Sequence, residues 1–156
     1  MMSGRIYSID SSALIHAWRR AYRPANFPSF WNWMDTLIAA RRLRASIEVF
    51  HEMAKKDDDI HAWCKERKHL LFEDLDGATQ AAVVRIMNAY PRLVDTARGR
   101  SGGDPFVIAL AIAAKPAMTV ITEEHPGKTK IPDVCLAEAV ECVNLVDMIE
   151  LEGWVA

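Results

Sequence analysis

The stretch at residues 101–114 constrains the fold most, because an aspartate stands at the start of an otherwise wholly apolar helix. It reads SGGDPFVIALAIAA. A helix that is apolar on all sides is buried, so the rest of the chain must supply a core around it. Asp104 has two compatible interpretations. It could cap the helix, with Pro105 at the first helical position, or it could present a metal-binding carboxylate at the helix edge.

Length and composition predict one globular domain spanning residues 1–156. Half of the residues (51%) are hydrophobic, which is enough to build a core at this length. The net charge of −2 gives no global basic character, so a nucleic-acid partner would need a local basic patch. Three cysteines without framework spacing indicate free thiols and a reducing compartment. No segment is long and apolar enough for a membrane span or a signal peptide, so we expect a cytoplasmic protein.

Short apolar strands alternate with helices along the chain, which predicts the α/β class with a buried, mainly parallel sheet. Ser29 and Ser46 are expected to cap the second and third helices. We expect strands at residues 5–9, 43–46, 117–122 and 141–145. We expect helices at residues 12–22, 29–42, 46–56, 59–71, 76–90, 104–114, 134–140 and 146–154.

Acidic side chains follow the strands or flank buried helix positions. Asp10 comes directly after the first strand, and Glu123 and Glu124 follow the strand that ends in TVIT. Asp104 opens the apolar helix, and Glu52 stands among apolar neighbours on the third helix. Ligands gather outside the carboxyl ends of such strands. Converging carboxylates repel one another, and a hard divalent cation such as Mg²⁺ or Mn²⁺ relieves the repulsion.

Each acid taken alone also has a purely structural interpretation. Asp10 could cap the helix that begins near Ser11, and Asp104 could cap its own helix. Glu52 could be a solvated helix residue, and the two glutamates after TVIT could belong to a polar loop. Spacing alone therefore leaves the metal site as one of two interpretations.

Four motifs occur here in the order typical of the PIN-domain nucleases, which this chain resembles. They are YSIDSSALI, VFHEM, GDPFVIALA and TVITEEH. The chain also resembles a PIN-like family of small bacterial proteins, through FPSFWNWM, HAWCKERKHLLF, YPRLVD, DPFVIALA and KIPDVC. The resemblance covers nearly the whole chain. It implies a PIN-like three-layer α/β/α fold with a short central parallel sheet.

The resemblance assigns roles to individual acids. Asp10, Glu52 and Asp104 match the three metal-binding acids of the family. Many PIN domains have an Asp two residues after the threonine of the late strand. This chain has Glu124 at that place, so we take Glu124 as the fourth catalytic acid.

Three further residues are accessory candidates. Glu123 and Asp133 are alternatives for the fourth acid, although Asp133 could equally be an ordinary acid in the first turn of a helix. Ser12 matches a polar residue that supports the first carboxylate or a phosphate in the family.

The function that the resemblance implies is a Mg²⁺- or Mn²⁺-dependent endoribonuclease, similar to the toxin of a VapC-type toxin–antitoxin pair. Its implied partners are an RNA substrate, an antitoxin protein and a second copy of the chain in a homodimer. Two alternatives stay open. One is a catalytically inactive PIN-like module that binds RNA or protein, and the other is a DNA-directed, flap-type nuclease. The full set of acids favours activity, and the small size favours RNA over branched DNA.

Basic and aromatic residues suggest the remaining contacts. Arg98 and Arg100 are expected to contact RNA. Two other arginine groups stand at helix ends, where they could hold phosphates or simply complement the helix dipoles; they are Arg19, Arg20 and Arg23, and Arg41, Arg42 and Arg44.

For FPSFWNWM, packing in the core or between subunits is favoured over base stacking. We predict self-association through an exposed apolar patch formed by Phe27, Phe30, Trp31, Trp33 and Trp154.

Overall fold

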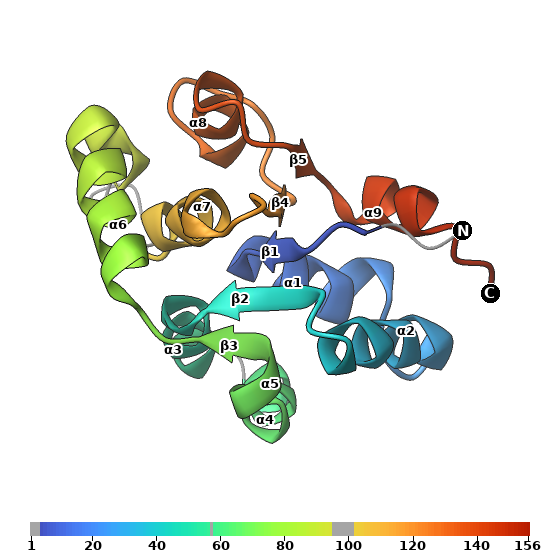
Figure 1. The fold of residues 1–156 in the computed structure, drawn as a ribbon. Helices are drawn as coiled ribbons and strands as arrows, with labels where there is room; N and C mark the ends of the chain where they lie inside the picture. Colours follow the sequence, from blue (N-terminus) through green and yellow to red (C-terminus); the bar gives the residue numbers. More distant parts are fainter. Residues whose placement is uncertain (1–3, 57, 95–101) are drawn as a thin grey trace.

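A computed structural model describes residues 4–56, 58–94 and 102–156, and in this part of the chain five strands form a single sheet. The strand order is β3-β2-β1-β4-β5, and every neighbouring pair is parallel (Figure 1). The predicted α/β class is therefore confirmed. The strands are β1 (Tyr7–Ile9), β2 (Leu43–Ser46), β3 (Phe72–Glu73), β4 (Thr119–Ile121) and β5 (Cys142–Val143).

Helices flank the sheet. The helix α7 packs on β1, β2 and β4, α6 packs on α7, and α2, α3 and α5 contact β2. Figure 1 shows α6 outside α7, on the opposite side of the molecule from α2. The helices are α1 (Ser11–His16), the π-helix η1 (Ala17–Ala21), α2 (Pro28–Ala39), α3 (Ile47–Lys56), α4 (Asp58–Glu66), α5 (Lys68–Leu71), α6 (Gly77–Ala89), the 3₁₀-helix η2 (Pro91–Leu93), α7 (Asp104–Ala113), α8 (Ile131–Ala137) and α9 (Leu145–Glu152). Among the described residues, no helix has the length and apolarity needed to cross a membrane.

Local signals located most elements but missed some boundaries. The predicted cap at Ser46 is confirmed, because its hydroxyl accepts a hydrogen bond from the Glu48 amide at 3.2 Å. Ser29 is not a cap: α2 begins one residue earlier, at Pro28, whose fixed φ suits the start of a helix. The predicted helix at residues 59–71 divides into α4 and α5. The two-residue strand β3 that follows was not predicted, because it is too short to show alternation.

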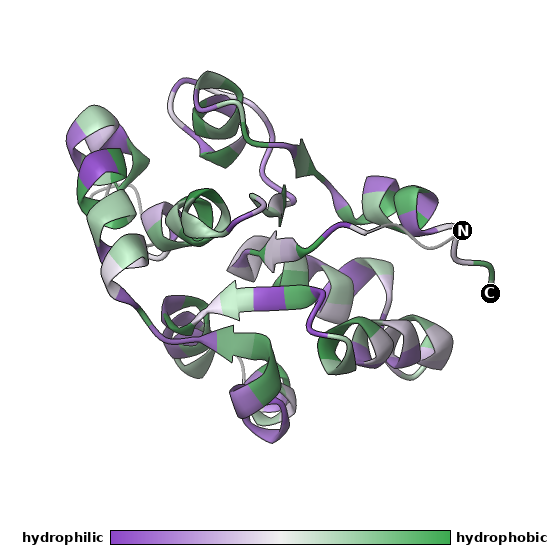
Figure 2. Ribbon diagram, in the orientation of Figure 1, coloured by the Kyte–Doolittle hydropathy of each residue, from purple (hydrophilic) through white to green (hydrophobic). Residues whose placement is uncertain are grey.

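The apolar helix α7 is buried, as its composition requires. Its buried residues include Val107, Ile108 and Leu110, and Figure 2 shows hydrophobic residues along α7 and β5 while α6 carries both kinds. The Ser8 hydroxyl on β1 donates to the Val107 carbonyl at 2.9 Å. This contact sets the position of α7 against the central strand, and hence the position of its first residue.

The aromatic residues pack within the molecule, which corrects the predicted exposed patch. Phe30 and Trp31 are only 1% and 6% exposed, and their rings meet edge to face at 5.2 Å. Trp154 contacts both Phe30 and Trp33, with ring centroids 6.3 Å and 4.9 Å apart. Phe27 is substantially exposed. Contacts within the molecule cover most of these rings, so the aromatic residues alone did not indicate a surface patch.

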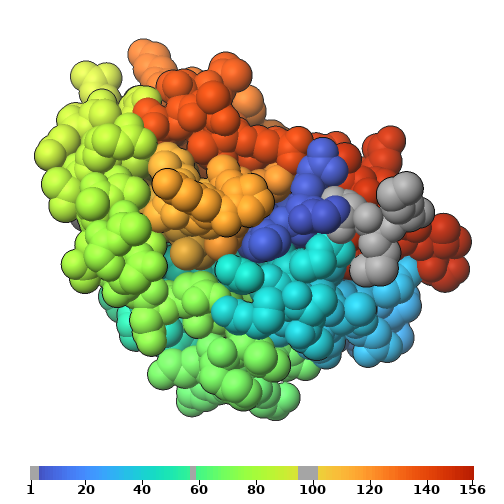
Figure 3. Space-filling view, viewed as in Figure 1, coloured from blue at the N-terminus to red at the C-terminus, as the bar shows by residue number. Residues whose placement is uncertain are grey.

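The sheet brings together segments that are distant in sequence. In Figure 3 the residues leading into β1 (dark blue) lie between those leading into β2 (cyan) and the C-terminal third (orange to red). A buried polar contact joins the same segments: the Tyr7 hydroxyl donates to Glu152 Oε2 at 2.5 Å, and Arg42 Nη2 donates to the same oxygen at 2.7 Å. These bonds tie the end of α9 to β1 and to the start of β2.

Candidate functional site

The site forms at the carboxyl edge of the sheet, where β1 and β4 end side by side. The register pairs Ile9 with Ile121, so the next residues, Asp10 and Thr122, lie level with each other. The helix α7 leads into β4 and runs antiparallel to it. Its first residue, Asp104, is therefore directed toward the same edge, where ligands gather in parallel sheets.

Asp10 is buried and held by three donors. Only 2% of the residue is exposed. Its Oδ1 accepts from the Ala13 amide at 2.8 Å, which makes Asp10 the N-cap of α1. The Ser12 hydroxyl lies 2.9 Å from both carboxylate oxygens, and the Thr122 hydroxyl donates to Oδ2 at 2.5 Å. Asp10 is thus a helix cap and also a carboxylate held in one orientation in a buried setting.

The pKa of Asp10 is raised to about 7, chiefly because burial removes water from the charged form. The negative charge of Glu124 adds to this increase in the pKa, whereas the bonds from Thr122, Ala13 and Ser12 oppose it. Near neutral pH the isolated carboxyl is therefore poised between its two protonation states. A nearby cation would favour the charged form.

Glu52 reaches the same region from α3. The Ser11 hydroxyl donates to its Oε2 at 3.1 Å, and Ser11 directly follows Asp10 in the chain. The side chain of Glu52 is thus tied to the residue next to the central aspartate. Glu52 is thus linked to the chain segment that carries Asp10 through a serine that the sequence interpretation had not used.

Asp104 is buried at the start of α7, with 7% of the residue exposed. The predicted cap is wrong by one residue. Gly103 is the N-cap, because its carbonyl accepts the first intrahelical bond, from Val107 N at 3.2 Å. Asp104 is the first helical residue and Pro105 the second. An acid in this first turn still interacts favourably with the helix dipole.

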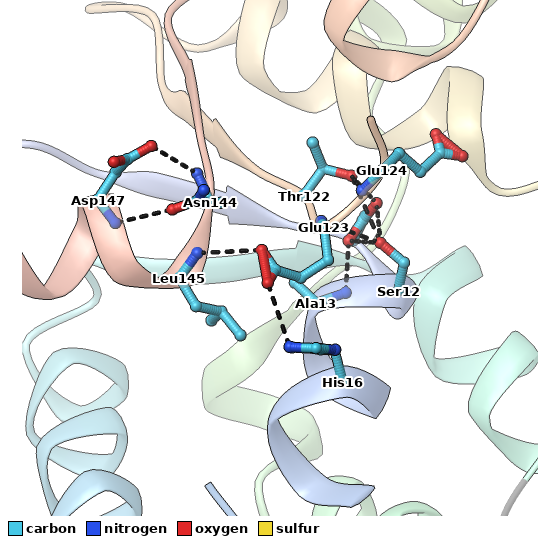
Figure 4. A network of polar contacts seen from close by, with 10 residues as sticks. Ser12, Ala13, His16, Thr122, Glu123, Glu124, Asn144, Leu145 and Asp147 are labelled. Atoms are coloured by element: carbon cyan, nitrogen blue, oxygen red, sulfur yellow. Dashed lines mark hydrogen bonds and ion pairs between the residues drawn. The ribbon is translucent and has the colours of Figure 1, made fainter. Parts of the chain in front are cut away.

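The two glutamates after β4 diverge. Glu123 Oε2 accepts from the Leu145 amide at the start of α9 at 3.3 Å, and its Oε1 lies 3.4 Å from His16 Nε2. Glu124 Oε2 accepts from the Ile131 amide at the start of α8, also at 3.3 Å. Figure 4 shows the Glu124 side chain leading away from Ser12, while Glu123 leads toward His16 and Leu145. Each carboxylate is thus placed at the N-terminus of a helix.

Asp133 has a structural role. Its Oδ2 accepts from the amides of Gly127 and Lys130 at 2.9 and 3.0 Å, which closes the first turn of α8. These backbone bonds lower the pKa of Asp133. Asp133 is therefore the first-turn acid of a helix, as one of its two interpretations had it, and its role as the fourth acid stays a prediction.

The predicted arginines separate into three groups. Arg98 and Arg100 lie outside the described residues. The second group makes ion pairs distant from Asp10: Arg41 and Arg44 pair with Glu73, and Arg42 pairs with Glu152. In the third group, Arg19 and Arg20 lie in η1, which continues the helix that Asp10 caps.

Two contributors were missed by the sequence interpretation, Ser11 and Thr122. Both are hydroxyl residues adjacent to a predicted acid, and this was the only local signal for them. The odd cysteine count did predict correctly that Cys64, Cys135 and Cys142 are free thiols.

The donor chemistry of the site fits a hard divalent cation. Asp10, Glu52 and Asp104 supply oxygen ligands, which Mg²⁺ and Mn²⁺ prefer, and burial raises the pKa of the central carboxyl. Within residues 4–56, 58–94 and 102–156, however, no three Asp, Glu, His or Cys side chains lie close enough together to hold a metal ion. The metal role of the three acids therefore stays a prediction.

Comparisons with known protein sequences give one family. A family described as "Domain of unknown function (DUF4411)" matches residues 7–156. A search of the curated proteins gave no match.

Two similar solved structures are VapBC assemblies. One is VapBC2 from Rickettsia felis bound to a DNA fragment from the promoter; it is 13% identical, with a TM-score of 0.54, covering 89% of this chain and 98% of that one. The other is VapBC-1 from nontypeable Haemophilus influenzae; it is 14% identical, with a TM-score of 0.53, covering 88% of this chain and 96% of that one. At these identities the likeness establishes the fold alone, and it confirms the predicted PIN-like fold.

Proposed function

The chain belongs to the DUF4411 family and has a PIN-like fold, and we propose that it is a divalent-metal-dependent ribonuclease that hydrolyses phosphodiester bonds. The observation that carries the proposal is the setting of Asp10. A buried carboxyl with a pKa near 7, oriented by two hydroxyls and a backbone amide, is costly for a fold to maintain. Such perturbed groups cluster at functional sites.

Asp10, Glu52 and Asp104 are the residues that would hold the ion. When bound there, Mg²⁺ or Mn²⁺ would lower the pKa of a water and neutralise developing phosphate charge. The Ser12 and Thr122 hydroxyls orient the Asp10 oxygens, and the Ser11 hydroxyl donates to Glu52.

Glu124 is proposed as the fourth acid, which orients the attacking water. Its bond to the Ile131 amide is 3.3 Å long, beyond the usual range for a strong N–H···O bond. Such a bond can be exchanged when substrate arrives. Glu123 is the alternative; it contacts His16, and both residues line a surface groove together with Ser12.

The proposal is tested by cleavage of a labelled single-stranded RNA and of single-stranded DNA of the same sequence. We expect RNA cleavage in Mg²⁺ or Mn²⁺ and none in EDTA. The Asp10→Asn variant should lose the activity, which also excludes a contaminating nuclease. Glu150→Gln is the matched control, because Glu150 is an exposed acid in the last turn of α9, the helix that runs away from the carboxyl edge. RNA cleavage that continues unchanged in EDTA would refute the metal mechanism.

A second candidate is a catalytically inactive module that binds RNA or protein. The observation that favours it is that, in the described part of the chain, no three potential ligands are assembled into a metal site. Under this alternative the protein binds RNA but leaves it intact in every metal tested. The same cleavage assay therefore decides between the two functions.

A protein partner and a homodimer complete the proposal. The similar solved structures are VapBC pairs, which supports an antitoxin-type partner for this chain. The homodimer rests on the family resemblance, since the aromatic residues that suggested it lie mostly inside. Light scattering at tens of micromolar tests the dimer, and expression of the gene alone and with its neighbouring gene tests a growth effect.

A further inference from the structure

A groove of about 440 Å³ opens beside Asp10, between the first helix and the end of α3. Its lining includes Ser12, whose hydroxyl bonds to the Asp10 carboxylate. It also includes Lys56, the last residue of α3. The groove therefore adjoins the carboxyl edge and leads away from it along the surface.

One continuous helical face forms the wall of this groove. Ser12, His16, Arg19 and Arg20 all line it, and their spacing of four, seven and eight residues puts them on one side of a helix. The face continues across α1 into the π-helix η1, where Tyr22 N donates to the Ala17 carbonyl at 2.9 Å. Such π turns are rare and frequently occur at functional sites.

The charges along the groove are mainly positive, in a chain whose net charge is −2. Arg19, Arg20 and Lys56 face one acid, Glu123, which lies 3.4 Å from His16. A helix-dipole interaction accounts for Arg19, because its Nη2 donates to the Lys56 carbonyl at the end of α3, at 2.9 Å.

The same explanation does not cover the other two cations. Arg20 and Lys56 are exposed, and their side chains make no hydrogen bond or ion pair with any described residue. The Arg19 bond holds η1 and the end of α3 together, which keeps both cations on the two walls of one groove.

We propose that this groove binds the phosphodiester backbone of single-stranded RNA on one side of the bond to be cut, with Arg20 and Lys56 contacting successive phosphates. The inference rests on the proposed function for its substrate. Backbone contacts position a strand without reading its sequence. Bound in this way, the strand would pass Ser12 and present its next phosphate to Asp10.

The experiment measures binding of a fluorescent 12-nucleotide RNA, and of single-stranded DNA of the same sequence, by anisotropy at several salt concentrations. EDTA is present throughout, so cleavage contributes nothing. The test variant is Arg20→Glu with Lys56→Glu. The control is Lys65→Glu with Lys115→Glu, which changes the net charge equally at two exposed lysines outside the groove. The variant Arg20→Lys with Lys56→Arg keeps the charge, and thermal melts check that all variants fold.

We expect the test variant to bind RNA about tenfold more weakly or worse at low salt, and the slope of log K against log salt to decrease by about 1.4, since each phosphate contact contributes about 0.7. The control and the charge-conserving variant should bind like the wild type. DNA should lose the same factor, because it carries the same phosphates. The proposal that the groove binds RNA is overturned if the test and control variants lose affinity equally, or if neither loses affinity. A loss confined to RNA, or a wild type that does not bind RNA, would also overturn it. If the protein binds RNA through the groove but does not cleave it, only the proposed nuclease activity is refuted.

Discussion

Replacing Asp10 by asparagine should change how stability depends on pH. Asparagine keeps the size of the side chain and an oxygen that can accept from Ala13 N and Ser12, but it cannot ionise. In the wild type without metal, burial raises the pKa of Asp10 from 3.8 to about 7. Between these values the folded state binds more protons than the unfolded state. The wild type should therefore lose stability as the pH rises through this range.

The magnitude follows from the two pKa values. At 1.36 kcal/mol for each pH unit, the full difference is about 4 kcal/mol and is reached above pH 7. Over the practical range from pH 5 to pH 8, the free energy of unfolding of the wild type should fall by about 2.5 kcal/mol relative to Asp10→Asn. Other titrating groups are common to both proteins and cancel in this difference.

Urea unfolding in EDTA, followed by tryptophan fluorescence at pH 5, 6, 7 and 8, measures the effect. The Glu150→Gln variant should remain parallel to the wild type, because Glu150 is exposed and distant from Asp10. Millimolar Mn²⁺ at pH 8 should restore much of the stability of the wild type and little of that of Asp10→Asn. Parallel curves for the wild type and Asp10→Asn from pH 5 to pH 8 would refute the argument that burial dominates this carboxyl.

Two further predictions concern Asp104 and the aromatic core. In EDTA, Asp104→Asn should lose the interaction of the charge with the helix dipole, which contributes about 0.3–1 kcal/mol at a helix start. The variant should also lose most of the thermal shift that Mn²⁺ gives the wild type, and a shift as large as that of the wild type would show that Asp104 does not bind the metal. Trp31→Ala should destabilise by about 3–5 kcal/mol in urea unfolding, because Trp31 is only 6% exposed and contacts Phe30. A change below 1 kcal/mol would show that the side chain is not packed as described.

Several site features could be predicted because their signals are local. The end of the first strand predicted Asp10 at the sheet edge, and the resemblance identified the serine two residues later as one of its hydrogen-bond donors. The helix that follows Asp104 is apolar on all sides, so its burial could be predicted without knowing which elements pack against it. The exact start of that helix could not be predicted, since both Gly103 and Asp104 are acceptable caps and only the bond to Val107 N distinguishes them.

Other features depended on contacts between distant parts of the chain. The sequence of α2 is the same whether its aromatic residues face a partner or the interior of the molecule. Contacts with Trp18, Trp63 and Trp154, which come from other parts of the chain, cover these rings. Glu123 and Glu124 are equivalent in sequence, yet the chain directs one toward α9 and the other toward α8. No local pattern distinguishes these directions.

The sequence by itself determined the α/β class, the buried helix α7, the free thiols and the position of Asp10 at the end of a buried strand. These follow from periodicity, composition and the chemistry of neighbouring residues, which act over a few positions. Tertiary structure alone decided that Thr122 lies level with Asp10, that Ser11 holds Glu52, and that Arg20 and Lys56 share one groove. The register of β1 with β4 and the packing of α1 against α3 bring these residues together across 36 to 112 positions. Such contacts form only when the whole core closes, because their free energy depends on burial that no single segment can supply.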